Sequence, residues 1–465
     1  ASLKETQLAS FSLTVDGNPV AEVQTDTLGF MFVGSQQGIG MHRLTALATD
    51  TAGVQDSVRF AIMVNPPPNN VPAPASIVDG FNPVDNSTVT LSLYAPFKKF
   101  VYVIGDFNDW QVDEAFLMNR DEVTQDSVRF WLTVSNLDPD VAYGYQYLVD
   151  GELRIADPYT ELVLDPFNDQ FIDNQTFPNL KPYPQGKTDK PVSVFKIDES
   201  QYQWQVETFQ RPEKKDLVIY ELLVRDFVAA HNYQTLVDTL AYLQRLGVNA
   251  VELMPVNEFE GNISWGYNPS FYFAPDKYYG TKNALKRFVD EAHKRGLAVI
   301  LDVVLNHSFG QSSFVRLYSE GDYGPPTPEN PWYNPTPRHP FNVGFDFNHE
   351  SPATKALVDR VLRFWLTEYR VDGFRFDLSK GFTQRFSTDD SQFRRFDQSR
   401  IDILERMATK MWQVDSTAYV ILEHFAENSE EIVLSDFGMM LWQNMNVAYS
   451  QSAMGWLSDP QRSSD

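Results

Sequence analysis

Cysteine is absent from the 465 residues, which excludes disulfides and thiol catalysis and leaves the redox compartment undecided. Long apolar runs are also missing, and none approaches the ~20 residues that a membrane-spanning helix needs. The opening stretch, ASLKETQLAS, lacks the basic start and apolar core of a signal peptide. The sequence therefore predicts no membrane span, and any export signal would already have been removed.

Basic residues are scarce, because 38 Lys and Arg stand against 62 Asp and Glu and leave a formal net charge of −24. Nucleic-acid backbones and anionic membranes bind proteins through many Lys and Arg side chains, so both kinds of partner are disfavoured. A neutral substrate is the natural expectation. Hydrophobic residues make up 43% of the chain and aromatics 14%, enough for large buried cores, and the length suggests about three domains.

Residues 1–65 alternate apolar and polar positions in short stretches separated by turn residues, a pattern typical of a small β-sandwich. The stretch ATDTAGVQDSV (48–58) resembles bacterial immunoglobulin-like modules, which act as spacers. The proline-rich segment 66–75 favours extended backbone, so we expect it to form a semi-rigid linker.

A second β-rich segment covers residues 76–180. Its GDFNDW motif (105–110) and the alternating tyrosines of AYGYQYLVDG (142–151) resemble the family 48 carbohydrate-binding modules, which precede the barrel in branching and debranching enzymes and in some amylases. The resemblance implies a second β-sandwich. Trp110 or Trp131 would then stack on glucose or, as buried tryptophans more often do, anchor the core of the module.

Residues 181–214 are predicted to form a connector, after which apolar strands alternate with amphipathic helices over residues 215–465. Strands that are apolar throughout indicate a parallel sheet covered on both faces. This many units in series favour a (β/α)8 TIM barrel, of which about six strands are visible, so we expect a barrel that is incomplete in this chain. The segment 307–352 is too long for a simple loop and predicts a small excursion over the barrel mouth.

The expected elements of this barrel can be given by residue. The predicted strands lie in 217–224, 250–256, 298–306, 373–379, 418–425 and 438–446. The predicted helices lie near 235–246, 281–296, 354–369 and 399–414.

Polar residues gather at the carboxyl ends of these strands, where barrel enzymes carry their reactive groups. In GFRFDLS the period of two puts Arg375 and Asp377 on one face, opposite the phenylalanines that suit the helix-facing side. An adjacent guanidinium favours the ionised carboxylate that a nucleophile needs. Glu423 lies near the end of the next strand, and His307 lies just beyond the strand that carries Asp302.

Each of these residues alone has a simpler interpretation. A strand-end aspartate beside an arginine is more often a structural ion pair, and a glutamate there can simply be solvated. A single histidine is more often a satisfied polar residue than a sugar ligand. Three such residues at consecutive strand ends, in a fixed order, form a far more specific pattern.

That order resembles glycoside hydrolase family 13, the α-amylase family, over about residues 215–450. The resemblance implies a retaining double displacement on an α-glucan. Five short segments carry it: DVVLNH (302–307), GFRFD (373–377), the strand that ends at Glu423, WGYNP (265–269) and FDFN (345–348).

The resemblance also implies a role for each matched residue. Asp377 would attack the anomeric carbon and form a covalent glycosyl intermediate, while Glu423 would protonate the leaving oxygen and then activate water. Arg375 would orient and ionise Asp377. The remaining implied contacts are His307 on sugar hydroxyls, Tyr267 and Trp265 at the sugar ring, Lys380 near the acceptor and Asn306 as a calcium ligand.

Two departures from the family pattern matter. Lys380 is followed by Gly381 where many α-amylases have histidine, so the usual acceptor-side histidine is absent, although a calcium contact through the backbone carbonyl would survive. No His-Asp pair follows Glu423 to supply the family's third carboxylate. An open barrel would leave bonding-competent edges, so we expect residues 1–465 to be part of a longer polypeptide.

The first functional hypothesis is hydrolysis of α-1,4-glucosidic bonds in starch, glycogen or maltodextrin. One alternative is α-1,6 debranching of the pullulanase or isoamylase kind, or glucan branching, which the GDFNDW and WGY elements favour. Another is a non-catalytic starch-binding protein with a degenerate barrel. The expected partner is an α-glucan, the expected cofactor is calcium, and the modular front favours export from a bacterial cell. The oligomeric state is left open.

Overall fold

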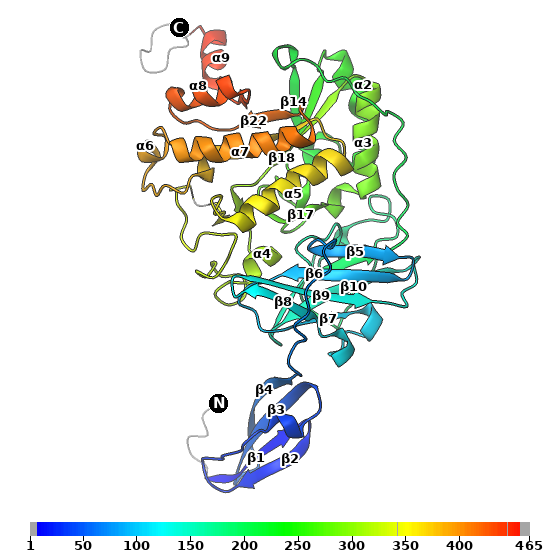
Figure 1. Cartoon of the computed structure of the whole chain (residues 1–465), viewed down its shortest axis with the longest axis vertical. Helices are drawn as coiled ribbons and strands as arrows, with labels where there is room; N and C mark the ends of the chain where they lie inside the picture. The colour runs from blue at the N-terminus through cyan, green and yellow to red at the C-terminus, as the bar shows by residue number, and fades with distance from the viewer. Residues whose placement is uncertain (1–6, 342, 444, 456–465) are drawn as a thin grey trace. The chain divides into compact units, whose positions relative to one another are not determined.

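The structure is a computed structural model that describes residues 7–341, 343–443 and 445–455 (Figure 1). The ends of the predicted first module and of the predicted barrel, residues 1–6 and 456–465, thus lie outside the described part. By compactness the chain divides into two units. One contains the residues up to 157 together with 184–199, and the other contains 158–183 and the residues from 200 onward. The domain limits expected from the sequence stay a prediction.

The first unit begins with one antiparallel sheet in the order β2-β1-β3-β4. Its strands are β1 (Leu8–Val15), β2 (Asn18–Val23), β3 (Gly40–Asp50) and β4 (Gln55–Val64). Alternating side chains of β1 and β3 form its small core, made of Leu13, Val15, Leu44 and Ala46. A four-stranded sheet fits the strands expected here, and the sandwich itself stays a prediction.

The same unit continues with two further antiparallel sheets. One has the order β5-β6-β9-β8, and in the other β10 pairs with β7, β11 and β13. The strands are β5 (Gly80–Asp85), β6 (Thr88–Tyr94), β7 (Val101–Gly105), β8 (Asn119–Thr124), β9 (Ser127–Val134), β10 (Ala142–Val149), β11 (Leu153–Ile155) and β13 (Val192–Lys196).

The GDFNDW motif forms the tight turn that follows β7. Asn108 accepts a hydrogen bond from the Gly105 amide (2.9 Å), and the Trp110 indole donates to Asp106 (3.1 Å). A Cβ atom at position 105 would lie 2.4 Å from the Gly144 carbonyl oxygen, so the close approach of β10 requires glycine there. Trp110 is buried, which favours its interpretation as an anchor over a sugar-stacking side chain.

The second unit is built on a six-stranded parallel sheet of half-barrel form, in the order β14-β15-β18-β21-β22-β23. Five predicted strands are confirmed, and the sixth, predicted over 438–446, is a strand only at Met440–Leu441 because α9 begins at Asn446. They are β14 (Ile219–Leu222), β15 (Ala250–Leu253), β18 (Ala298–Val303), β21 (Gly373–Phe376), β22 (Tyr419–Leu422) and β23 (Met440–Leu441).

The four predicted helices are confirmed as well, and each begins at a side chain that caps free backbone amides. They are α2 (Tyr233–Arg245) after Asn232, α3 (Lys282–Lys294) after Thr281, α5 (Pro352–Glu368) after Ser351 and α7 (Gln398–Val414) after Asp397. Figure 1 shows α2 beside α3 and α5 beside α7, and both pairs are in contact.

Shorter elements are also present, and three of them lie in the predicted excursion between β18 and α5, where β19 (His307–Ser308) pairs with β20 (Phe345–Asp346). They are β12 (Val163–Leu164), α1 (Val224–Phe227), β16 (Asn257–Phe259), β17 (Pro269–Pro275), β19 (His307–Ser308), α4 (Ser313–Arg316), β20 (Phe345–Asp346), α6 (Asp390–Phe393), α8 (Asn428–Phe437) and α9 (Asn446–Ala453). Among the described residues, no helix is long and apolar enough to cross a bilayer.

The inward face of the parallel sheet changes character along its strands. Towards the amino ends it is apolar, and Ala250, Ala298, Ile300, Tyr419 and Ile421 form one buried cluster. The period of two continues that face through Glu252, Asp302, Arg375, Asp377 and Glu423 at the carboxyl ends. Charged side chains therefore meet at the end of the sheet where a TIM barrel carries its active site.

Candidate active site

Arg375 is the centre of the charged cluster. Its β21 position pairs with Asp302 of β18, and its Nη1 atom lies 2.9 Å from both Asp302 carboxyl oxygens. The same Nη1 atom lies 3.3 Å from Asp377 Oδ1, and Nη2 lies 3.1 Å from Glu423 Oε2. One guanidinium therefore contacts three carboxylates, including both predicted catalytic residues.

Exposure separates the members of this cluster. Asp302 is fully buried and the Arg375 side chain is 6% exposed, whereas Asp377 and Glu423 are 15% and 22% exposed. The two predicted catalytic carboxylates are thus the ones that a substrate can reach. The Leu378 amide donates to Glu423 Oε2 (3.0 Å), and Leu378 itself has the left-handed φ of 43°. Such backbone strain in a residue other than glycine is common at functional sites.

Burial dominates the electrostatics of the cluster. It raises the pKa of Asp377 above the usual aspartate value, Arg375 opposes the increase, and the charge of Glu423 adds to it. Burial likewise raises the pKa of Asp302 against the pull of Arg375. The ionising effect that we expected from Arg375 is present, but burial outweighs it at Asp377.

Tyr267 and His307 extend the cluster through hydrogen bonds. The Tyr267 hydroxyl donates to Asp302 Oδ2 (2.6 Å), and His307 Nε2 lies 2.8 Å from the Tyr267 carbonyl oxygen. Since a carbonyl only accepts, Nε2 carries the proton. Burial lowers the pKa of His307 to about 4, so the ring is neutral near pH 7. The ring nitrogen that carries the proton is therefore bound to Tyr267 rather than presented to a sugar.

Trp265 and Lys380 stand apart from these contacts. The Trp265 side chain is among the exposed large hydrophobic groups of the chain. The Lys380 ammonium group lies 3.3 Å from Asp390 Oδ1 and 4.7 Å from the centre of the Phe393 ring. Lys380 is nearly completely buried, so it reaches an acceptor sugar only if this contact breaks.

A second group of polar atoms surrounds Asn306. Asn306 Oδ1, Asp346 Oδ1 and both ring nitrogens of His339 are buried and form no hydrogen bonds with the described residues. A Cβ atom at Gly381 would come within 1.9 Å of Asn306 Oδ1, so position 381 lies directly beside it. His339 Nε2 lies 3.5 Å from Asp346 Oδ1 without a hydrogen bond between them. Buried oxygens that accept no hydrogen bond suit a hard cation, and Asn306 and Asp346 fit calcium as two of its ligands.

Two further acidic groups lie beside Asp302 and were not among the residues predicted from the sequence. Glu221 and Glu252 lie close enough to Asp302 for one carboxyl oxygen of each to fall within 4.8 Å of the others. Burial, with the charges of Asp302 and Glu221, raises the pKa of Glu252 to about 8. Glu252 could have been noticed in the sequence, because it is the single charged residue in the apolar stretch AVELMPV. The buried contacts next to Glu423 were not predicted from the sequence either. They join Ser379, His424, Glu430 and Arg400.

Several known proteins are similar to this chain. Residues 230–345 match the family model described as "Alpha amylase, catalytic domain". The chain is 28% identical over 299 residues to malto-oligosyltrehalose trehalohydrolase of Saccharolobus solfataricus, and 30% identical over 284 residues to chloroplastic isoamylase 1 of Arabidopsis thaliana. These alignments cover 63% and 51% of this chain, and 44% and 35% of the relatives. The chain thus spans under half the length of either protein.

Solved structures show the same fold. A type I pullulanase from Bacillus subtilis crystallised with maltose superposes with a TM-score of 0.54 at 21% identity, covering 90% of this chain and 57% of that one. At this level of identity the likeness concerns the fold alone.

Proposed function

We propose that this chain carries a catalytic domain of the α-amylase family, glycoside hydrolase family 13, and acts on α-glucans at their α-1,6 branch points, by debranching. The similarity to isoamylase supports this alternative better than the plain α-1,4 hydrolysis that we put first from the sequence. Glucan branching is the second candidate, because the chain is also 30% identical over 306 residues to a 1,4-α-glucan branching enzyme of Chlamydia trachomatis.

The contact of Arg375 with both Asp377 and Glu423 supports the catalytic part of this proposal. A retaining glycosidase needs two carboxyl groups about 5–5.5 Å apart, one as nucleophile and one as acid and base. A shared guanidinium holds two such groups near each other and fixes the orientation of each. Asp377 would attack the anomeric carbon, and Glu423 would give its proton to the leaving oxygen and later take one from water.

The charges of the cluster fit these roles. Arg375 favours the ionised form of Asp377, which a nucleophile needs, even though burial raises its pKa. Asp302, held by Arg375 and Tyr267, would fix the guanidinium in place. His307 would then act on the substrate through its position beside Tyr267 rather than through a free Nε2–H group.

The test is product analysis with the full-length protein on pullulan, amylopectin, amylose and glycogen, in the wild type and in Asp377→Asn. Debranching predicts linear chains from amylopectin and maltotriose from pullulan, and little product from amylose. Branching would instead lower the iodine colour of amylose without release of reducing ends. Binding to insoluble starch with no product from any glucan would support the non-catalytic alternative.

We also propose that Asn306 and Asp346 hold a calcium ion, with the backbone at Gly381 alongside. The unpaired buried oxygens support this proposal. Calcium would neutralise the buried charge there and fix the excursion to the end of β18. A melting temperature that falls on chelation in the wild type, but not in Asn306→Ala, would support the site. Equal melting temperatures with chelator and with calcium would contradict it.

The GDFNDW-containing segment, residues 76–180, is proposed as a carbohydrate-binding module and residues 1–65 as a spacer. The two antiparallel sheets and the ordered 105–110 turn support the first assignment. Export to the outside or the surface of the cell stays a prediction.

A further inference from the structure

Residues 260–268 form the loop between β16 and β17, which pair as an antiparallel hairpin, and this loop carries Tyr267. Two of its large apolar side chains, Ile263 and Trp265, are 80% and 61% exposed. Burial of apolar surface usually holds a loop against the rest of a protein, and these two side chains contribute little of it. The position of the loop, and with it that of Tyr267, therefore depends mainly on polar contacts.

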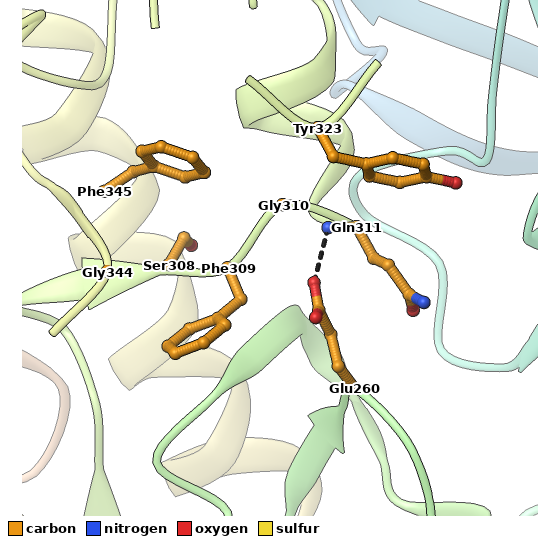
Figure 2. Close-up of a pocket in the computed structure, with 8 residues that line it drawn as sticks. All are labelled: Glu260, Ser308, Phe309, Gly310, Gln311, Tyr323, Gly344 and Phe345. Carbon is orange, nitrogen blue, oxygen red and sulfur yellow. Dashed lines mark hydrogen bonds between the residues drawn. The ribbon is translucent and has the colours of Figure 1, made fainter. Parts of the chain in front are cut away.

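Some of these polar contacts come from the barrel and its excursion. At the start of the loop, Glu260 accepts a hydrogen bond from the Gln311 amide (2.7 Å), and Figure 2 shows this contact in the wall of a pocket. Further along, the Arg225 guanidinium donates to the Ser264 carbonyl oxygen (3.1 Å). Near its end, Tyr267 makes the contacts with the candidate active site that are described above.

The other contacts come from residues 158–183, which we call the strap. The chain leaves the first compact unit after residue 157, contributes the strap to the second unit and returns to the first at residue 184. The Asn262 side-chain amide donates to the Asn168 carbonyl oxygen of the strap (2.9 Å). The next strap residue, Asp169, lies 3.3 Å from the ammonium group of Lys277, just beyond β17. The strap thus contacts the hairpin both at its loop and at its base.

The contact at the base is part of a buried charge cluster. The buried Lys277 ammonium group also pairs with Glu258 of β16. The other carboxyl oxygen of Asp169 accepts a hydrogen bond from the Asp165 amide (2.9 Å), which fixes the carboxyl group within the strap. One buried ammonium group therefore joins β16, the end of β17 and the strap. Charge-assisted contacts in such surroundings are strong and directional.

We propose that the strap positions Tyr267 against the substrate, with Asp169 as a positioning residue that acts through Lys277 and the hairpin. The inference rests on the proposed function and on the sugar-ring contact that the family resemblance implies for Tyr267. Among the described residues, Asp169 pairs with Lys277 and Asp165 and with no member of the Arg375 cluster. Any effect of Asp169 on the reaction must therefore pass through the hairpin.

The test is a double-mutant cycle that combines Asp169→Asn with Tyr267→Ala in the full-length protein. Asp169→Asn keeps the shape of the side chain and removes its charge, while Glu258 remains as a counter-ion of Lys277. With Tyr267 in place, kcat/KM on pullulan should fall about tenfold, because small displacements of groups that hold a substrate are costly in rate. With Tyr267→Ala, the same change should lower kcat/KM by less than about twofold. A merely structural role would lower it by the same factor in both backgrounds.

Two further variants sharpen the cycle. Glu161→Gln removes another carboxylate of the strap, one that is paired with Lys282, and should leave kcat/KM unchanged. Asn262→Ala removes the second strap contact at a partly exposed position and should lower kcat/KM about threefold, only while Tyr267 is present. If Asp169→Asn does not fold, Asn262→Ala decides, and equal factors with and without Tyr267 would overturn the positioning role.

Binding of maltohexaose, measured by calorimetry in the same variants, separates this inference from the proposed function. An active enzyme in which Asp169→Asn has no effect, or the same effect in both Tyr267 backgrounds, would overturn the positioning role and leave the function intact. A wild type that releases no product, but whose affinity for maltohexaose falls in Asp169→Asn only while Tyr267 is present, would support the positioning role and overturn the catalytic proposal. Absence of both activity and binding would overturn both.

Discussion

Two buried arginines lie near Glu423, and their surroundings differ. Arg400 is paired with a single carboxylate, Glu430, through two hydrogen bonds of 2.6 and 2.7 Å, and its remaining nitrogen contacts are backbone carbonyls. Arg375 faces three carboxylates, and its Nε atom has no hydrogen-bond partner among the described residues. The charge of Arg400 is matched by one buried carboxylate. The charge of Arg375 is outnumbered by three carboxylates, two of which are partly exposed to solvent.

The pKa directions follow the same division. Burial alone would raise the pKa of Glu430, but His424 and Arg400 together bring it below the usual glutamate value. Around Arg375, burial and mutual repulsion prevail, and the pKa values of Asp302 and Asp377 rise. A balanced buried pair is what structural support requires, while excess negative charge in a reachable site is a mark of function. We therefore infer that Arg400 stabilises the fold and that Arg375 takes part in catalysis.

The largest expected effect is that of Asp377→Asn on catalysis. Loss of the nucleophile should lower kcat by about 10⁴-fold or more, because a residue that acts in concert with its partner cannot be replaced by binding alone. The folded protein should be at least as stable, since Asn carries no buried charge. Initial rates on amylopectin and a thermal melt measure the two quantities. A rate within tenfold of the wild type would remove Asp377 from the mechanism.

The next effect concerns stability rather than rate. Glu430→Gln leaves Arg400 buried without its counter-ion and should lower the free energy of unfolding by about 3–5 kcal/mol. The more exposed pair of Arg406 and Asp359 provides the control, and Asp359→Asn should change stability by about 0–1 kcal/mol. Urea unfolding of both variants measures the difference. Equal losses would show that burial does not distinguish the two pairs.

The next effect depends on pH and belongs to Glu252. Its folded pKa of about 8 lies above the unfolded value of about 4, so the folded protein keeps a proton that the unfolded chain loses. Wild-type stability should therefore fall as pH rises from about 4 to 8, by at most about 1.4 kcal/mol per pH unit from this group. Glu252→Gln removes this contribution to the pH dependence of stability.

The melting temperature of Glu252→Gln relative to the wild type should accordingly increase between pH 5 and pH 8 and change little above that. A difference that is constant with pH would mean that Glu252 is ionised in the folded protein throughout this range.

The smallest effect is expected at Ser379, which links the two groups. Its Oγ atom lies 3.0 Å from both the Glu423 carbonyl oxygen and His424 Nδ1. Ser379→Ala should cost about 1 kcal/mol of stability, the usual value for one hydrogen bond, and leave kcat within about tenfold. Unfolding and rate measurements on the same preparation test this. A loss of activity comparable to that of Asp377→Asn would mean that the two groups act as one.

Much of the barrel was predictable from local pattern. Continuous apolar strands and amphipathic helices have periods that depend only on nearby residues, so the six strands and four helices were found. The period of two also placed Arg375 and Asp377 on one face. The pairing of Arg375 with Asp302 depends instead on the register between β18 and β21, which no local pattern contains.

Three other features of the site could not be predicted from the sequence, because they depend on tertiary contacts. The Lys380 ammonium group contacts Asp390, which lies ten residues further along the chain, and this contact depends on the path of the loop after β21. The raised pKa of Asp377 comes from burial, which a single strand does not reveal. Glu252 became significant only once β15 was placed beside β18, where its carboxyl group meets Asp302.

The central claim is that Asp377 forms a covalent bond to the substrate, and it can be tested by trapping the intermediate. The full-length protein would be incubated with an activated fluorinated glucosyl donor that reacts quickly and hydrolyses slowly, then digested and analysed by peptide mass spectrometry. We expect one added glycosyl mass on the peptide that contains Asp377, and none in Asp377→Asn. An adduct on another residue, or an active enzyme with no adduct at all, would contradict it.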